Sequence, residues 1–253
     1  MAEEKKRIMF VMPSVSEKWN DNTRELLNRY VSPGFEVNLV NVKYGGIESI
    51  PGLVMAVTLP YIIHEILEAA QEGYDAIIPN CCSDPGVAET RSVVNVPVVG
   101  PAESALHIAC TLGYRIGIIE VGGTPPNWAH QLVKKHGLSD RLASVRSVAL
   151  AVEDCGDAKL TLDALHEASL KAVEQDRAEV LVFGCTGLTG YAEELQRRLD
   201  IPVVEPSLAA LKMAEVLIAM NLKHSRLAFP LESAFGAGAG AEVKYPPTLK
   251  PYS

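Results

Sequence analysis

The strongest constraint on the fold is an internal repeat that relates the two halves of the chain. Residues 68–81 align without gaps with residues 172–185, so Cys81 and Cys185 occupy equivalent positions 104 residues apart. The Val-Pro-Val-Val run at 96–99 recurs as Ile-Pro-Val-Val at 201–204, and its proline follows the cysteine by 16 residues in one copy and 17 in the other. A repeat of this length predicts two similar structural units.

Each half alternates short apolar runs with amphipathic stretches of helical period. In the first half the strand-like runs are 7–12, 35–42, 75–78 and 96–99, and the helical stretches are 22–30, 59–72 and 102–112. Strands that alternate with helices form a parallel sheet covered by helices on both faces. The sequence therefore predicts an α/β fold with two similar lobes.

The repeat also sets the expected domain boundaries. We expect residues 1–104 together with 207–230 to form the first α/β lobe, and residues 105–206 to form the second. The helical stretch at 208–222 is expected to pack back on the first lobe. Residues 231–253 are rich in Gly, Ala and Pro and are predicted to be a C-terminal extension.

Composition excludes two classes of partner. The net charge is −8 and no run of Lys and Arg is present, which argues against a nucleic-acid-binding surface. No apolar stretch approaches the roughly 20 residues that span a bilayer, so no membrane association is expected. The charged start of the chain runs directly into the first predicted strand and is unlike a signal peptide.

The cysteine pattern points to free thiols. Five cysteines, an odd number, together with the lack of an export signal predict reduced thiols and a cytoplasmic location. There is no Cys-x-x-Cys pair, and the adjacent Cys81 and Cys82 have poor geometry for zinc. No metal site is therefore predicted.

Cys81 and Cys185 each follow a buried strand, at the edge where open α/β sheets bind ligands. After Cys81, Asp84 is expected to be the N-cap of a helix. After Cys185, a turn leads into a helical stretch at 191–199. Each thiol is therefore expected beside a helix N-terminus, where free N–H groups and the helix dipole favour a thiolate and can hold a carboxylate or enolate oxygen.

The turn residues next to the thiols are the predicted substrate contacts. These residues are Cys82, Ser83, Thr186 and Gly187. The backbone of both turns and the hydroxyls of Ser83 and Thr186 offer hydrogen-bond donors to a small anionic or polar substrate. These contacts apply if the two turns face the same cleft between the lobes.

Two equivalent thiols on opposite sides of a substrate suit a proton transfer at one carbon. One thiolate removes a proton from one face of the carbon, and the other thiol returns a proton to the opposite face. A lone cysteine is often only a small core residue, but the equivalent positions of Cys81 and Cys185 favour function. The scheme requires no cofactor, and the chain has no convincing glycine-rich nucleotide loop.

The residues around the two cysteines resemble a known family. The segments Asn-Cys-Cys-Ser-Asp-Pro-Gly at 80–86, Val-Pro-Val-Val-Gly at 96–100 and Gly-Cys-Thr-Gly-Leu at 184–188 are similar to the hydantoin racemase branch of the aspartate/glutamate racemase superfamily. The resemblance covers about residues 7–225. It implies two Rossmann-like lobes related by pseudo-two-fold symmetry, an active site in the cleft between them, cofactor-independent racemisation and a homo-oligomer. It also implies that Cys81 and Cys185 are the catalytic acid and base.

The sequence departs from the family pattern at the loop after the first strand. Ser14 stands where the family usually has an asparagine that contacts substrate, and its hydroxyl can still donate one hydrogen bond. Gly187 stands where glutamate and aspartate racemases have a histidine. The sequence therefore leaves the substrate open between a small carboxylate, an amino acid and a hydantoin.

Three other functions remain open at this point. Within the superfamily, a maleate-type cis–trans isomerase uses one cysteine as a nucleophile, and an arylmalonate-type decarboxylase keeps one cysteine as a proton donor. Two intact cysteines argue against the decarboxylase. In a different class, two lobes around a cleft also describe a non-catalytic small-molecule binding protein.

Overall fold

The computed structural model describes residues 5–45, 52–122, 127–151 and 158–231. The first half contains, in chain order, β1 (Lys6–Met12), α1 (Asn20–Tyr30), β2 (Phe35–Asn41), α2 (Gly52–Gln71), β3 (Ala76–Pro79), α3 (Val87–Thr90) and α4 (Pro101–Leu112). The second half contains β4 (Ile116–Gly122), α5 (Trp128–Lys135), η1 (Ser139–Arg141), β5 (Leu142–Ala151), α6 (Ala158–Glu174), β6 (Val180–Phe183), η3 (Thr186–Leu188), α7 (Ala192–Leu199), β7 (Val203–Val204) and α8 (Pro206–Ala219).

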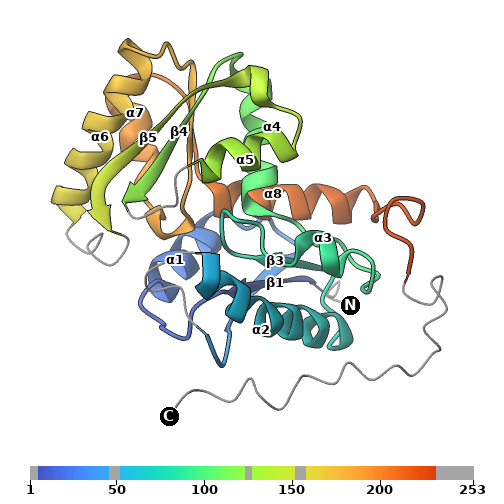
Figure 1. Cartoon of the computed structure of the whole chain (residues 1–253). Helices are drawn as coiled ribbons and strands as arrows, with labels where there is room; N and C mark the ends of the chain where they lie inside the picture. The colour runs from blue at the N-terminus through green and yellow to red at the C-terminus, as the bar shows by residue number, and fades with distance from the viewer. Residues whose placement is uncertain (1–4, 46–51, 123–126, 152–157, 232–253) are drawn as a thin grey trace.

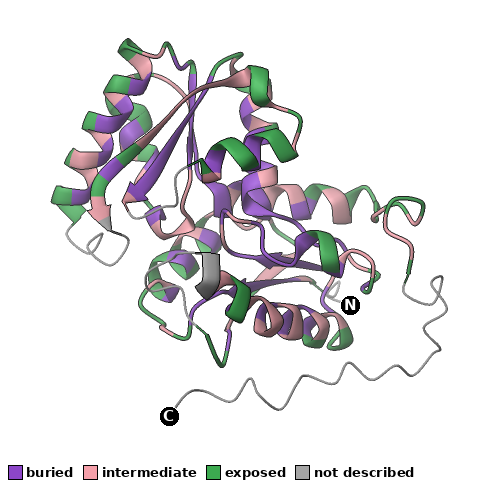
Figure 2. Ribbon diagram, in the orientation of Figure 1, coloured by how far each residue is buried: buried purple, intermediate pink, exposed green. Residues whose placement is uncertain are grey.

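Two parallel sheets with equivalent strand orders form the two halves, as the repeat predicted. The first sheet has the order β2-β1-β3 and the second has the order β5-β4-β6-β7. Every residue of β3 and β6 is buried, which explains their continuous apolar sequences, because parallel sheets are covered on both faces (Figure 2). The predicted α/β fold with two parallel sheets is confirmed.

The strand predicted at residues 96–99 forms only a single bridge. Val98 pairs with Ile77 of β3, and the backbone bonds from Ile77 to Pro97 and from Val99 to Ile77 are both 3.0 Å long. This contact places Val98 where the second sheet has β7. The short strand predicted at 96–99 is thus reduced to one bridge, because the chain soon leaves the sheet to enter α4 at Pro101.

The helices α4 and α8 each pack against the sheet of the other half of the chain. α4 contributes Ala105 and Leu106 to a core cluster with β4 and β6, whereas α8 contributes Ala210 and Leu211 to a cluster with β1 and β3. The two helices contact each other between the lobes (Figure 1). This exchange joins the halves, and the lobe boundaries given above remain a prediction.

Two further sequence expectations concern the C-terminal extension and membrane-spanning segments. Apart from Leu231, the predicted C-terminal extension at 231–253 lies outside the described residues. Among the helices of the described ranges, none combines the length and apolar character required to cross a bilayer.

Candidate active site

Cys81 and Cys185 lie two residues beyond the ends of β3 and β6. In each sheet the intervening residue continues the pairing with the central strand: Asn80 donates its N–H to β1 at 2.8 Å, and Gly184 donates its N–H to β4 at 2.7 Å. The two thiols therefore lie at equivalent positions, at the carboxyl ends of the two sheets.

The turns that follow the two cysteines share an equivalent backbone hydrogen bond. The carbonyl of Cys81 accepts the N–H of Asp84 at 3.0 Å, and the carbonyl of Cys185 accepts the N–H of Leu188 at 3.2 Å. The acceptor and the donor are three residues apart in both turns. The internal repeat of the sequence is thus reproduced in the local geometry of the candidate site.

Each sulfur is hydrogen-bonded by the residue two positions later. The N–H of Gly187 donates to the sulfur of Cys185 at 3.3 Å, where Cys185 is the N-cap of η3. At the other thiol, both the backbone N–H and the hydroxyl of Ser83 interact with the sulfur of Cys81, and the hydroxyl lies 3.3 Å away. Such N–H groups stabilise a thiolate.

The environment of Cys81 favours its neutral thiol. Burial raises the pKa of the Cys81 thiol, the hydrogen bonds from Ser83 lower it, and the Asp84 carboxylate raises it again, so that the pKa lies above its ordinary value. A thiolate with a raised pKa is a stronger base, which narrows the gap to a weakly acidic carbon. Cys81 is therefore equipped both to donate and to accept a proton.

Hydrogen bonds across the lobes bring the two strand ends together. The Thr186 hydroxyl donates to the carbonyl of Asn80 at 3.0 Å, and the Cys82 thiol donates to the carbonyl of Phe183 at 3.6 Å. Burial raises the pKa of Cys82 well above its ordinary value, and charge on Cys185 or Cys81 would raise it further. The three sulfurs thus lie within electrostatic range of one another.

The predicted site residues differ in exposure. Five are partly exposed: Cys81, Ser83, Cys185, Thr186 and Gly187. Cys82 is only 2% exposed, and its sulfur faces the carbonyl of Phe183 between the lobes. This placement gives Cys82 a packing role, and its contact with substrate stays a prediction.

Ser14 lies two residues beyond the end of β1, at the same edge of the first sheet as Cys81. Its side chain is buried and accepts the N–H of Ser16 at 3.0 Å. Its carbonyl accepts a hydrogen bond from the Asn41 side chain at 2.9 Å. A substrate contact by Ser14 also stays a prediction.

The prediction that Asp84 caps the helix directly after Cys81 was wrong. That helix, α3, is four residues long and has Gly86 as its N-cap. The Asp84 carboxylate instead accepts the N–H groups of Ala102 and Glu103 at 2.9 and 2.8 Å, which makes it the cap of α4. The local sequence pattern could not show this, because the capped helix starts 17 residues further along the chain.

A buried carboxylate that the sequence analysis missed lies at the start of α8. The Glu205 side chain accepts the N–H of Leu208 at 2.6 Å and is 6% exposed. Its Oε1 atom has no hydrogen-bond partner among the described residues, and burial raises the pKa of Glu205 to about 7. The available signal was its position immediately before Pro206, the first residue of the helix.

Glu205 should make the stability of the protein depend on pH. An unfolded glutamate releases its proton near pH 4.3, but the folded protein holds this proton until about pH 7. The folded state therefore binds more protons in this window, and stability should fall as pH rises through it. Glu205→Gln should make this fall shallower in urea denaturation across the window, leaving the contribution of Asp84, whose pKa burial also raises to about 7.

The exposed Glu25→Gln replacement is the control for the loss of a carboxylate. It should keep the steepness of the wild-type profile. An equally steep profile in Glu205→Gln would contradict the prediction.

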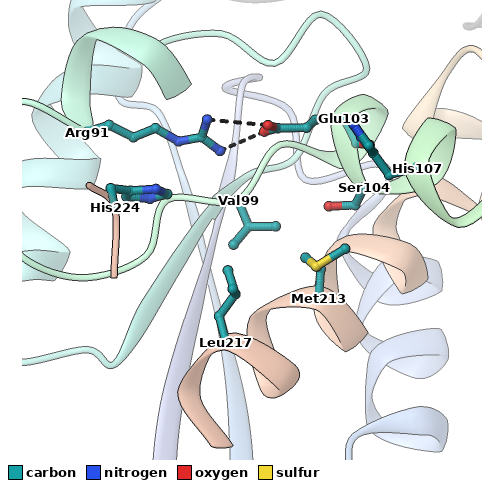
Figure 3. Close-up of a pocket in the computed structure, with 8 residues that line it drawn as sticks. All are labelled: Arg91, Val99, Glu103, Ser104, His107, Met213, Leu217 and His224. Atoms are coloured by element: carbon teal, nitrogen blue, oxygen red, sulfur yellow. Dashed lines mark hydrogen bonds and ion pairs between the residues drawn. The ribbon is translucent and has the colours of Figure 1, made fainter. Parts of the chain in front are cut away.

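A separate pocket of about 270 Å³ lies between α4 and α8 (Figure 3). It is lined by Arg91, Val99, Glu103, Ser104, His107, Met213, Leu217 and His224, and it contains none of the predicted site residues. Its central charges are paired with each other, since Arg91 and Glu103 form an ion pair at 2.6 Å.

Across the described part of the chain, no group of three or more His, Cys, Asp or Glu side chains is arranged to hold a metal ion.

Comparisons with known proteins show the family of this chain. The family described as Asp/Glu/Hydantoin racemase matches residues 9–214. A hydantoin racemase of Pseudomonas sp. (strain NS671) is 32% identical over 171 residues, which is 67% of this chain and 69% of the relative. A hydantoin racemase of Paenarthrobacter aurescens is 29% identical over 222 residues, which is 87% of this chain and 94% of the relative.

A solved structure of a racemase has a similar fold. The allantoin racemase from Klebsiella pneumoniae superposes with a TM-score of 0.84 at 26% identity, and the match covers 89% of this chain and 94% of that one. The residues matched by the family, 9–214, include both cysteine turns. The chain therefore belongs to the Asp/Glu/hydantoin racemase family.

Proposed function

We propose that this protein is a cofactor-independent racemase that inverts the carbon α to a carbonyl in a hydantoin-like ring, with Cys81 and Cys185 as its two bases. The observation that carries the proposal is the equivalence of the two cysteine turns, each with an N–H group directed at its sulfur. The relatives named hydantoin racemase and allantoin racemase favour a cyclic ureide as the substrate.

The reaction is a balanced transfer of one proton out and one proton in. The Cys81 thiolate takes the proton from one face of the carbon, which leaves an enolate, and the Cys185 thiol donates a proton to the opposite face. Cys81 ends as a thiol and Cys185 as a thiolate, and the opposite enantiomer uses the same pair in reverse. Exchange of protons with solvent resets the two thiols.

In this mechanism the backbone N–H groups bind the sulfurs, and the Ser83 hydroxyl binds the substrate. The N–H groups of Ser83 and Gly187 stabilise whichever sulfur is ionised, instead of the enolate oxygen. The Ser83 hydroxyl, 3.3 Å from Cys81, is placed to donate to a substrate oxygen when the sulfur is protonated. Preorganised donors of this kind stabilise developing charge in acyl and enolate chemistry.

Chiral chromatography of single enantiomers tests the proposal. The assay panel contains D- and L-5-substituted hydantoins, allantoin, aspartate, glutamate, maleate and an arylmalonate, each beside an enzyme-free control for spontaneous racemisation. We expect rapid racemisation of at least one cyclic ureide. Turnover of maleate alone would show that the protein is a cis–trans isomerase, and turnover of the arylmalonate alone would show that it is a decarboxylase. Turnover of none of these compounds would favour a binding protein.

Location and assembly are part of the same proposal. Among the described residues, the cysteines Cys81, Cys82, Cys110 and Cys185 form no disulfide, which suits the reducing cytoplasm. Assembly into a homo-oligomer stays a prediction for measurement by light scattering.

A further inference from the structure

The two halves cap their equivalent helices in different ways. α4 and α8 both begin with proline, at Pro101 and Pro206. At α8 the N-cap residue Glu205 supplies its own carboxylate. At α4 the N-cap is Gly100, which has no side chain, and the capping carboxylate comes from Asp84 on the Cys81 turn.

Asp84 therefore ties the Cys81 turn to α4. Its N–H donates to the carbonyl of Cys81, while its buried carboxylate accepts two N–H groups of the helix. A Cβ atom at Gly100 would lie 2.5 Å from the Asp84 carboxyl carbon, so only glycine leaves room for this contact. Asp84 also has a φ of 48°, a left-handed conformation that costs energy for a residue with a side chain.

The tie continues from α4 back to the first sheet. Glu103, whose N–H donates to Asp84, forms an ion pair with Arg91 at 2.6 Å (Figure 3). Arg91 in turn donates to the carbonyl of Val98 at 2.9 Å, and Val98 pairs with Ile77 of β3. Since Cys81 follows β3 closely, the turn is fastened both to its own strand and to α4, which packs against the sheet of the other half.

The Cys185 turn is tied differently: its Thr186 hydroxyl donates to the carbonyl of Asn80 at 3.0 Å, and within the described residues no carboxylate of this turn caps a helix. The position equivalent to Asp84 is Leu188, which is fully buried among apolar residues of the second lobe. The carboxylate that caps α8 is on Glu205, which is not part of the Cys185 turn. The two thiols are thus equivalent in backbone geometry but differ in how they are anchored.

From this asymmetry we infer that Asp84 is a positioning residue that serves the Cys81 half of the reaction and not the Cys185 half. The inference rests on the proposed two-thiol racemisation. Loss of the Asp84 carboxylate should let the Cys81 sulfur move away from its productive position, and a displacement of about 1 Å can slow a reaction by about 100-fold. Cys185 should keep its ability to remove a proton.

Asp84→Gly removes the carboxylate and retains the left-handed backbone. We expect racemisation to slow by about 10- to 100-fold. In deuterium oxide, the enantiomer that Cys185 deprotonates should exchange its α-proton for deuterium faster than it inverts, because Cys185 works while proton return by Cys81 is slow. The other enantiomer should show no such excess of exchange. Cys81→Ser identifies which enantiomer is which.

The ratio of exchange to inversion does not depend on how much of the protein is folded. Arg146→Ala, which breaks the remote ion pair with Asp176, is the control for lost stability and should keep the wild-type ratio. Gly100→Ala displaces the same carboxylate from the opposite side and should reproduce the one-sided excess if Asp84→Gly does not fold. NMR on each pure enantiomer gives both rates.

The outcomes distinguish failure of the role inferred for Asp84 from failure of the proposed racemase function. A wild-type ratio for both enantiomers in Asp84→Gly, or in Gly100→Ala where that variant is the one that folds, would overturn the role of Asp84 while leaving the racemase intact. An equal rise of the ratio for both enantiomers would also overturn it. If the wild-type protein does not racemise, or if Cys81→Ser still does, the proposed function itself fails.

Discussion

Cys81→Ser and Cys185→Ser should each abolish racemisation, a loss of about 10²- to 10⁴-fold. The reason is that a serine hydroxyl is far less acidic than a thiol and cannot act as the general base, a role that contributes about 10² to 10⁴ in rate. Both variants should still bind the substrate, because the turns keep their backbone hydrogen bonds. The two variants should differ in which enantiomer they still exchange.

With one thiol intact, the enantiomer that presents its proton to this thiol can exchange it for solvent deuterium without inversion. Each variant should therefore exchange one enantiomer only, and the two variants should choose opposite enantiomers. NMR in deuterium oxide measures the exchange, and chiral chromatography measures the inversion. Cys110→Ser, in α4 and half-buried, is the matched control that should keep racemisation.

Full racemisation by either serine variant would show that one cysteine is dispensable. Such a result would direct attention to a one-thiol isomerase or to another base. Exchange of the same enantiomer by both variants would show that the two thiols do not serve opposite faces.

Phe10→Ala should destabilise the protein by about 3–5 kcal/mol, the usual cost of a large-to-small replacement of a fully buried aromatic residue. Phe10 lies in the core cluster in which β1 and β3 pack against Ala210 and Leu211 of α8. The cavity left behind would weaken the attachment of α8 to the first sheet. Urea denaturation followed by circular dichroism measures the loss.

The exposed Leu227→Ala is the control for Phe10→Ala. Leu227 is 98% exposed, so its replacement should change the free energy of unfolding by no more than about 0.5 kcal/mol. A loss below about 1 kcal/mol in Phe10→Ala would mean that α8 closes over the cavity and is not held by this cluster.

The sequence by itself determined the architecture and the two thiols. An internal repeat can be seen without coordinates, since equivalent strands need the same apolar pattern and equivalent turns need the same small residues. Continuous apolar runs identified β3 and β6 because both faces of these strands are buried. The position of a cysteine directly after each run then placed both thiols at the ligand-binding edge of a sheet.

Only the tertiary structure decided how the lobes are joined and how the Cys81 turn is held. Asp84 is a residue type that commonly caps the helix that follows it, but its carboxylate binds the first N–H groups of α4 instead. The N-cap residue of α4, Gly100, has no side chain that could bind them. Glu205 caps its own helix through Leu208, and its sequence position could not show that this carboxylate is buried. Local propensities act over a few residues, whereas the Asp84 carboxylate is placed by contacts with a helix that begins 17 residues further along the chain, and the burial of Glu205 depends on the packing of the whole fold.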